Sequence, residues 1–180
     1  YKSINSDFQI DLKSGIINVI NQENIDWKIS LIDTGNHTMT GGRLKRLKNE
    51  LSDEPFFVTY GDGLANVNLR KLLDFHNLQK KMITLTAVRP NARFGELKLD
   101  GPIVESFIEK PQLHEGWING GFMVMNPDFL DLIENDLTML EREPMETAAK
   151  LGQLGAYRHD GFWQCMDTKR DKELLESILN

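Results

Sequence analysis

Alternating and uninterrupted apolar runs predict short strands along the first half of the chain. Residues 6–12 and 27–33 alternate polar and apolar positions, which is the pattern of half-exposed strands. Residues 16–20 form another short apolar run after a Lys-Ser-Gly turn. Residues 55–60 and 82–88 are rich in apolar, β-branched and aromatic residues and are too short for helices, so we expect buried strands there.

Four more strands are expected in the second half of the chain. Residues 94–99 and 103–108 flank an Asp-Gly-Pro turn, which predicts a pair of adjacent strands. Residues 120–125 and 156–159 are further short apolar runs. Prolines and glycines separate most of these segments, as they do between the strands of small sheets.

Five segments have the apolar spacing or the start signals of helices. They are residues 43–51, 68–80, 126–133, 143–152 and 169–179. The last is amphipathic, and its expected inward positions are Leu174, Leu175, Ile178 and Leu179.

The interleaving of strands and helices predicts an α/β fold with a mixed sheet. The 180 residues are enough for one domain with a sizeable core, and no repeat or linker interrupts them. We therefore expect residues 1–180 to form a single domain.

Composition narrows the functional classes. A net charge of −6 argues against non-specific binding to nucleic acid, because that affinity comes from basic residues on phosphates. No apolar run approaches the roughly 20 residues of a membrane-spanning helix, and the first residues do not resemble a signal peptide. The single cysteine, Cys165, excludes an internal disulfide and suits a reducing compartment. The sequence thus predicts a cytoplasmic protein that binds neither nucleic acid nor membranes.

Two glycine-containing loops are candidate ligand sites. Gly61-Asp62-Gly63 follows the strand expected at residues 55–60, so Asp62 points to the crevice at strand ends where α/β sheets bind ligands. Gly41 and Gly42 precede the helix expected at residues 43–51, where free N–H groups favour an anion. The alternatives are an ordinary turn at Asp62 and an ordinary loop before the helix.

The candidate reactive side chains suit a site for a hard metal ion better than they suit a zinc site or nucleophilic catalysis. The four histidines lack close pairing and no Cys-x-x-Cys exists, which makes zinc improbable. Asp62 and Asp167 each lie at an element end, so they are either a Mg²⁺ site or two ordinary caps. Cys165 lies in an apolar setting and is interpreted as a packed thiol. Lys110, between Glu109 and Pro111 at a strand end, either holds a phosphate or is simply exposed.

Six motifs together resemble the sugar-nucleotide pyrophosphorylases, and among them most closely the cytidylyltransferases that act on glucose 1-phosphate. Glu-Lys-Pro alone is weak, whereas Gly-Phe-Trp-Gln-x-Met-Asp-Thr after Ile-Asn-Gly-Gly-Phe is highly specific. The order and spacing of the motifs match along nearly all of the chain. The motifs are Thr38-Met39-Thr40-Gly41-Gly42-Arg43-Leu44-Lys45-Arg46, Tyr60-Gly61-Asp62-Gly63, Arg93-Phe94-Gly95, Glu109-Lys110-Pro111, Ile118-Asn119-Gly120-Gly121-Phe122 and the stretch from Gly161 to Thr168.

The resemblance implies a Rossmann-like, mostly parallel sheet with flanking helices, and a role for each matching residue. Asp62 and Asp167 are implied to bind a catalytic Mg²⁺, and Lys110 to hold the phosphate of glucose 1-phosphate. The implied sugar-binding residues are Gly95, Glu109, Asn119 and Gly120. The implied nucleotide-base pocket contains Gly41, Gly42 and Arg43, and Thr168 and Arg170 are weaker candidates for phosphate contacts.

The implied reaction is nucleotidyl transfer from CTP to glucose 1-phosphate, which yields CDP-glucose and pyrophosphate for 3,6-dideoxyhexoses of bacterial surface polysaccharides. It needs no covalent intermediate, in agreement with the lack of a convincing nucleophile. Two alternatives stay open. One is a pyrophosphorylase that uses UTP or dTTP, and the other is a non-catalytic sugar-phosphate-binding or oligomerising module.

One departure from the family pattern concerns the start of the chain. Members begin with a strand and a Gly-Gly-x-Gly-Thr-Arg loop around the triphosphate, followed by a Lys-Pro segment, and none of these occurs here. We therefore expect an N-terminally truncated nucleotidyltransferase domain whose 180 residues give no useful turnover alone. A homo-oligomer is possible, because an unpaired sheet edge favours association.

Overall fold

The computed structural model describes residues 7–21, 28–90, 96–108 and 116–179. It divides the chain into two compact units, Tyr1–Asp33 and Thr34–Asn180. Each unit is described by itself below. The expectation of a single domain over residues 1–180 therefore stays a prediction. Among the described residues, no helix combines the length and the apolar character needed to cross a membrane.

The first unit contains an antiparallel hairpin of β1 (Asp7–Ile10) and β2 (Ile17–Asn21), as expected. Its turn is held by the Asp11 carboxylate, which accepts from Lys13 N at 2.8 Å. The strand predicted at residues 27–33 is wrong for residues 28–33, which have no regular structure. Leu31 there is 94% exposed. Alternation in a sequence makes a strand only where another strand supplies hydrogen bonds, and the structure shows none beside this segment among the described residues.

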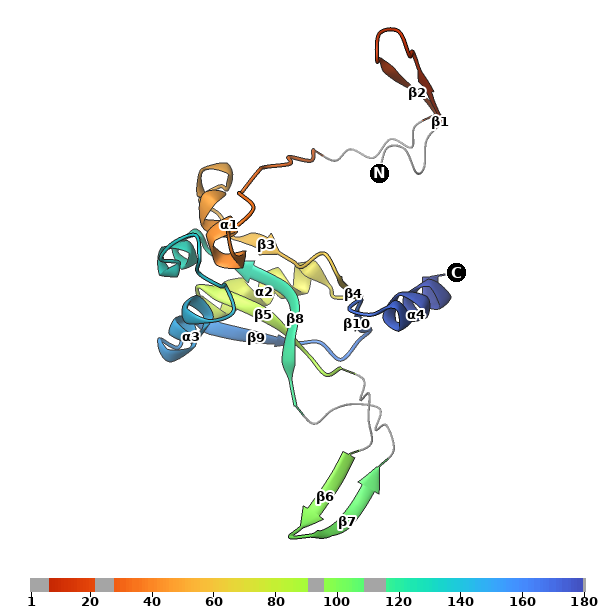
Figure 1. Ribbon diagram of the computed structural model, residues 1–180. Coiled ribbons are helices and arrows are strands. Elements are labelled where there is room, and N and C mark those ends of the chain that lie inside the picture. The colour runs from red at the N-terminus through yellow and green to blue at the C-terminus, as the bar shows by residue number, and fades with distance from the viewer. Residues whose placement is uncertain (1–6, 22–27, 91–95, 109–115, 180) are drawn as a thin grey trace. The chain divides into compact units, whose positions relative to one another are not determined.

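A four-stranded mixed sheet forms the centre of the second unit (Figure 1). Its order is β3 (Phe56–Val58), β8 (Ile118–Met125), β5 (Ile83–Val88) and β9 (Leu154–Arg158). β8 is antiparallel to both β3 and β5, and β5 is parallel to β9. Three of these four described strands thus run in one direction, in agreement with the expected α/β fold.

Helices and two-stranded ribbons complete the second unit. The ribbons pair β4 (Gly63–Ala65) with β10 (Trp163–Cys165) and β6 (Glu96–Asp100) with β7 (Ile103–Ile108), both antiparallel. The helices are α1 (Thr40–Arg46), α2 (Leu69–Gln79), α3 (Glu143–Lys150) and α4 (Lys169–Leu179), with 3₁₀ turns η1 (Lys48–Glu50) and η2 (Pro127–Leu132).

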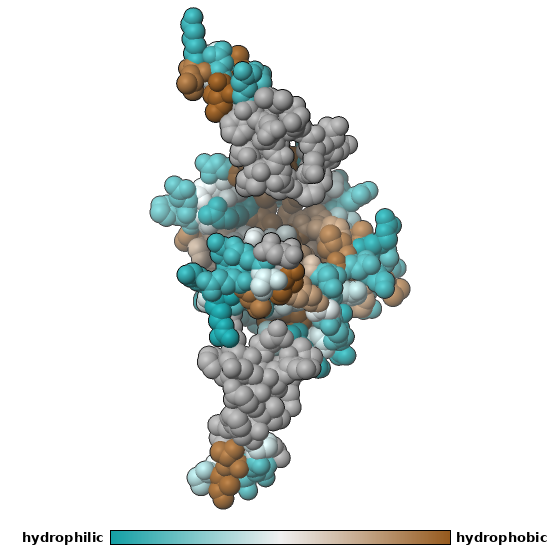
Figure 2. Space-filling view, turned by 90° about the vertical axis from the view of Figure 1, so that its right-hand side faces the viewer, coloured by the Kyte–Doolittle hydropathy of each residue, from teal (hydrophilic) through white to brown (hydrophobic). Residues whose placement is uncertain are grey.

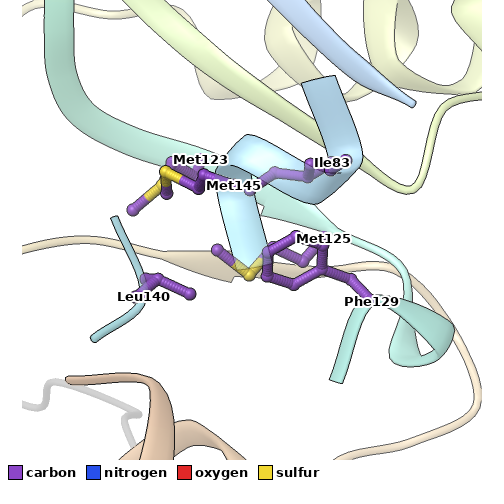
Figure 3. Packing of buried hydrophobic residues seen from close by; sticks show 7 residues of the cluster. Ile83, Met123, Met125, Phe129, Leu140 and Met145 are labelled. Carbon is purple, nitrogen blue, oxygen red and sulfur yellow. The ribbon is translucent and has the colours of Figure 1, made fainter. Parts of the chain in front are cut away.

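Methionines and aromatic or branched side chains from the sheet and its helices fill the core (Figure 3). Ile83 on β5, Met123 and Met125 on β8, and Phe129 on η2 are completely buried. Full burial of such side chains contributes roughly 1.5–3 kcal/mol each. The core therefore joins β5 and β8 to η2 and α3, and this fixes the central strands whose ends carry the candidate site.

A buried polar group ties α2 to the sheet. His76 is 2% exposed, and its Nδ1 lies 2.9 Å from Thr84 Oγ1 while its Nε2 lies 3.1 Å from Asn126 Oδ1. The helix predicted to start at residue 126 implied a cap from Asn126. Asn126 does stand at the N-cap position of η2, but its side chain donates to Lys81 O at 3.0 Å and makes no capping hydrogen bond. Hydrogen bonding of the buried imidazole contributes more to stability than a helix cap would, because an unpaired buried polar group costs about 1–3 kcal/mol.

The Gly-Gly motif forms a bulge in β8. Leu85 pairs with Met123 and Ala87 with Asn119, so three residues of β8 face one residue of β5. Gly121 takes a φ of +82° at this place, a conformation that side chains disfavour. β8 bends strongly along its length in Figure 1, and the bend redirects Asn119 and Gly120 at the carboxyl ends of β3 and β5.

Two further expectations need correction. The strand at residues 55–60 is not buried: it shortens to β3 at one side of the sheet, and Phe57 is 45% exposed. Of the expected inward residues of α4, Leu175 is buried, whereas Leu174 and Ile178 are exposed, and the side chain of Leu179 lies outside the described residues. Among the described side chains of α4, the buried ones are Asp171 and Leu175, which lie one turn apart on the same side of the helix. Figure 2 shows brown hydrophobic residues among teal hydrophilic ones on this face of the molecule.

Candidate functional site

The ribbon of β4 and β10 brings Asp62 and Asp167 together from opposite ends of the second unit. Gly63 pairs with Cys165, and beyond that pair Met166 N donates to Asp62 O at 2.8 Å. Asp62 is therefore held across from Met166, next to Asp167 in the chain. Both carboxylates are exposed, and Asp167 Oδ2 accepts from Cys165 Sγ at 3.1 Å. The sequence predicted a turn followed directly by a helix and missed β4, which makes this pairing.

Trp163 attaches this ribbon to the bulge of β8. Its indole Nε1 donates to Gly120 O at 2.8 Å. On the other side, a Cβ on Gly120 would lie 2.7 Å from Val88 Cγ1, so glycine allows β8 to approach β5 closely at this point. The Gly-Phe-Trp and Asn-Gly-Gly motifs are thus in direct contact, and the two aspartates lie just beyond one end of a ribbon that is anchored beside Asn119 and Gly120.

The start of α4 follows Asp167 and is capped by a reciprocal pair. Thr168 N and Thr168 Oγ1 donate to Asp171 Oδ2 at 3.0 and 2.8 Å, and Asp171 N donates back to Thr168 Oγ1 at 3.2 Å. Gln164 Nε2 on β10 also lies 3.3 Å from Asp171 Oδ1. The hydrogen bonds of Thr168 thus serve the helix, which weakens its candidacy as a phosphate contact. Arg170 is exposed on the first turn of α4.

A hydrogen-bond network around Tyr60 joins three of the motifs. Tyr60 OH donates to Glu141 Oε1 at 2.5 Å, and Thr40 Oγ1 donates to Glu141 Oε2 at 2.9 Å. The Asn119 side chain also interacts with the phenol, and its Oδ1 accepts from Gly121 N at 3.0 Å. The start of α1, the end of β3 and the bulge of β8 are therefore linked through one tyrosine and one glutamate.

Burial and Glu141 raise the pKa of Tyr60 well above its usual range. Burial is the larger cause, because a phenolate is poorly solvated there, and the hydrogen bond to the Glu141 carboxylate adds to it. The neutral phenol is therefore the form that the fold stabilises. Because the folded-state pKa is raised, this stability is complete below the unfolded pKa of about 10 and declines as the pH rises above it.

We expect Tyr60→Phe to lower the free energy of unfolding by about 1.5 kcal/mol, the usual contribution of a hydrogen bond to a charged group. Chemical denaturation at pH 7 measures this loss. Tyr157→Phe is the matched control, because the Tyr157 ring packs edge-on against Phe75 and no hydrogen bond from its hydroxyl is found among the described residues. Equal losses for the two variants would contradict the network.

Gly41 and Gly42 lie inside α1, which begins three residues earlier than expected. Gly41 N and Gly42 N both donate to Thr138 O, at 3.1 and 3.3 Å. A Cβ on Gly42 would lie 2.5 Å from Asp136 O. The expectation of two free N–H groups for an anion is wrong here, because a neighbouring backbone segment occupies them. The alternative of an ordinary loop before the helix does not hold either, because both glycines belong to α1.

Basic residues of α1 complete the contact with the segment after η2. Arg46 forms a bidentate pair with Asp136, at 3.0 and 2.6 Å, and also donates to Thr34 O. Lys45 Nζ donates to the carbonyl oxygens of Ile133 and Glu134. Arg43, a predicted base-pocket residue, donates to Thr34 Oγ1 at 2.7 Å. The Thr-Gly-Gly-Arg motif thus holds α1 in place, and its role toward a nucleotide base stays a prediction.

The described residues therefore place Asp62, Asp167, Asn119 and Gly120 in one region. The ligand contacts predicted for the other site residues are not tested. Gly95, Glu109 and Lys110 lie outside the described residues. Sequence reasoning missed Glu141, which belongs to no motif and lies 81 positions from Tyr60. Sequence reasoning also did not predict a hydrogen bond from Trp163, although the indole N–H of a partly buried Trp usually finds an acceptor.

The two aspartates suit Mg²⁺ by their chemistry. Mg²⁺ takes oxygen ligands, with one or two carboxylates supplemented by substrate phosphates and water. Asp62 and Asp167 offer two exposed carboxylates at neighbouring backbone positions. Among the described residues, no group of three or more His, Cys, Asp or Glu side chains could hold a metal by itself. A Mg²⁺ ion bound by these two carboxylates would need its other oxygen ligands from substrate phosphates and water.

Comparison with known proteins adds independent information. The Nucleotidyl transferase family profile matches residues 14–163. Glucose-1-phosphate cytidylyltransferase of Salmonella typhi is 50% identical over 153 residues, which are 84% of this chain and 60% of that protein. The probable glucose-1-phosphate cytidylyltransferase of Bacillus subtilis (strain 168) is 38% identical over 177 residues, 98% of this chain and 68% of that protein. The chain thus spans about 60% of the length of the Salmonella relative.

Solved structures share the fold at low sequence identity. HddC from Yersinia pseudotuberculosis superposes with a TM-score of 0.64 at 18% identity, over 87% of this chain and 69% of that one. A UDP-glucose pyrophosphorylase complexed with UDP-glucose superposes with a TM-score of 0.59 at 14% identity, over 83% and 65%. These similarities support the mixed α/β fold expected from the sequence.

Proposed function

The chain belongs to the nucleotidyl transferase family, and we propose that the protein transfers the cytidylyl group of CTP to α-D-glucose 1-phosphate, giving CDP-glucose and pyrophosphate. The 50% identity to a protein named for this reaction supports the choice of substrates. We propose further that the reaction runs in the cytoplasm and supplies CDP-glucose for the dideoxyhexoses of surface polysaccharides.

The observation that carries the proposal is the pairing of β4 with β10. It places Asp62 and Asp167, which are more than 100 positions apart, at neighbouring backbone positions. A cation held between these two chain segments would take an oxygen ligand from each aspartate. A catalytic metal gives a reason for two exposed aspartates here, whereas two independent caps do not require their proximity. The capping role after Asp167 is taken by Thr168 and Asp171.

In the proposed reaction, a phosphate oxygen of glucose 1-phosphate attacks the α-phosphorus of CTP. A new oxygen–phosphorus bond forms, the bond to the β-phosphate oxygen breaks, and pyrophosphate leaves. Catalysis of such a transfer consists mostly of positioning and charge neutralisation. Asn119 and Gly120 orient the sugar, and Lys110 holds its phosphate. The bulge of β8 and the bond from Trp163 keep Asn119 and Gly120 beside the ribbon.

Asp62 and Asp167 would hold the Mg²⁺. When bound, Mg²⁺ supplies positive charge that offsets the repulsion between two anionic substrates. The residues of the chain supply the rest: the ribbon holds the two carboxylates, and the Tyr60 network holds Asn119 relative to the end of β3.

Pyrophosphate release from glucose 1-phosphate tests the proposal, with CTP, UTP, dTTP or ATP as the second substrate. We expect release with CTP and Mg²⁺, at least tenfold slower release with the other nucleotides, and none with EDTA. The assay is run on these 180 residues and on the same residues joined to a Gly-Gly-x-Gly-Thr-Arg segment, and we expect useful release from the second chain only. Faster release with UTP or dTTP than with CTP would make that nucleotide the proposed substrate in place of CTP. If neither chain releases pyrophosphate with any nucleotide, a non-catalytic sugar-phosphate-binding module is favoured.

A further inference from the structure

Two arginines converge on one tryptophan at the carboxyl ends of β5 and β9. The guanidinium carbon of Arg89 lies 4.5 Å from the centre of the Trp117 ring, and that of Arg158 lies 5.4 Å from it. Arg89 and Arg158 are exposed, and Trp117 is partly buried. We call this set the Arg–Trp–Arg cluster. It shares no residue with the aspartates, the Tyr60 network or any motif discussed above.

The sheet itself fixes this convergence. Arg158 is the last residue of β9 and pairs with Ala87 of β5. Val88 pairs with Ile118, so Arg89 and Trp117 are the next residues outward along β5 and β8. Because paired residues and residues two apart on one strand lie on the same face of a sheet, the three side chains share one face. The cluster therefore lies at the ends of three adjacent strands: Arg158 is the last residue of β9, and Arg89 and Trp117 are each one residue beyond β5 and β8.

The electrostatics of the cluster are unusual for this protein. The chain carries a net charge of −6, yet two cations meet here. Across residues 7–21, 28–90, 96–108 and 116–179, neither arginine has an ion pair or a hydrogen bond from its guanidinium. A cation–π contact offsets part of the repulsion between the two cations, by about 0.5–1 kcal/mol at exposed sites. Both guanidinium groups are exposed, so their remaining N–H donors face solvent and are accessible to a dissolved ligand.

We propose that Arg89 and Arg158, held over Trp117, bind the phosphate group of a small ligand. A guanidinium presents its N–H donors as a rigid fork that matches two phosphate oxygens. Two such groups beside one aromatic ring match a doubly charged phosphate in both charge and number of donors. Ligands of α/β sheets bind at the carboxyl ends of the strands, where this cluster lies. The proposal does not rest on the proposed reaction, because it concerns phosphate binding alone.

The test observes Trp117 directly. The chain has three tryptophans, Trp27, Trp117 and Trp163, so labelling with 5-fluorotryptophan gives three ¹⁹F resonances, and Trp117→Phe identifies the one of interest. Inorganic phosphate is titrated into the 180-residue chain at constant ionic strength. We expect a saturable shift of the Trp117 resonance with phosphate and none with glucose or with equal added KCl.

Variants assign the binding to the two arginines. Arg89→Gln and Arg158→Gln are each expected to weaken phosphate binding about tenfold, the equivalent of one charge-assisted hydrogen-bonded contact. Arg89→Lys keeps the charge without the fork and should give a smaller loss. Arg70→Gln, an exposed change on α2, is the matched control and should bind phosphate like the parent chain. Circular dichroism confirms that each variant is folded.

Separate titrations with glucose 1-phosphate and with inorganic phosphate identify which kind of phosphate the cluster binds. Tighter binding of glucose 1-phosphate than of inorganic phosphate, weakened in both glutamine variants, would assign the cluster to a phosphate monoester, and equal binding of the two would assign it to the free anion. If the Arg–Trp–Arg cluster only stabilises β8, the glutamine variants will have lower melting temperatures and an unchanged affinity for phosphate. That result, or the lack of a saturable Trp117 shift in the folded parent chain, would overturn the proposal. Neither result affects pyrophosphate release, so the two proposals fail separately.

Discussion

Asp62→Asn and Asp167→Asn should each reduce pyrophosphate release from CTP and glucose 1-phosphate by about 10³-fold or more. Each change removes one of the two carboxylates proposed for Mg²⁺, and a 10³-fold loss equals about 4 kcal/mol of transition-state stabilisation. Both residues are exposed, and the ribbon is held by the backbone bond from Met166 N to Asp62 O, which asparagine preserves. We therefore expect the free energy of unfolding to stay within about 0.5 kcal/mol of the parent value.

The measurement is steady-state pyrophosphate release over a range of Mg²⁺ concentrations, on the chain joined to a glycine-rich segment. Asp74→Asn is the control, because Asp74 is an exposed aspartate on α2, away from the ribbon. Full activity of either site variant at ordinary Mg²⁺ would contradict the metal assignment. Loss of activity together with loss of the folded signal would point to a structural role for that aspartate.

Gly42→Ala should destabilise the protein by about 3 kcal/mol, although Gly→Ala inside a helix ordinarily stabilises by up to 1 kcal/mol. The reason is the close contact of α1 with the segment that follows η2. A Cβ on Gly42 would lie 2.5, 2.6 and 2.8 Å from the O, Cα and C atoms of Asp136, all of them backbone atoms that cannot turn aside. The helix would have to move, which disturbs the pair between Arg46 and Asp136.

Chemical denaturation of the 180-residue chain measures this effect. Gly116→Ala is the control, because nothing lies within 4 Å of the position that its Cβ would take and its φ is not positive. We expect the control to change stability by no more than about 0.5 kcal/mol. An increase in stability for Gly42→Ala would show that α1 is not packed as closely as the structure has it.

Local signals were sufficient for several elements of the fold. The helix expected at residues 68–80 is α2, because Asn68 caps its first turn by accepting from Lys71 N at 2.9 Å. The hairpin of β6 and β7 follows from the Asp-Gly-Pro turn, where Gly101 takes a φ of +54°. The strand at residues 82–88 is β5, which is buried along most of its length. In each case the hydrogen bonds or the burial follow from nearby residues or from a long apolar run.

Long-range contacts explain the failures. Residues 28–33 alternate like a strand but have no strand beside them in the described chain. Gly41 and Gly42 look like a loop before a helix because glycine is a poor helix former, and only the backbone at residues 136–140 shows why glycine is needed inside α1. The roles of Asp62 and Asp167 came from the resemblance to a family, and their proximity could not be derived from spacing.

The sequence by itself determined the mixed α/β class, the positions of most strands and helices, and the motifs that identify the family. Apolar periodicity, caps and turn residues carry this information because they act over a few neighbouring positions. Only the tertiary structure decided which distant residues meet: Asp62 with the segment before Asp167, Trp163 with Gly120, Tyr60 with Glu141, and Arg89 and Arg158 with Trp117. Strand order and register set these contacts, and both depend on pairing between segments far apart in the chain.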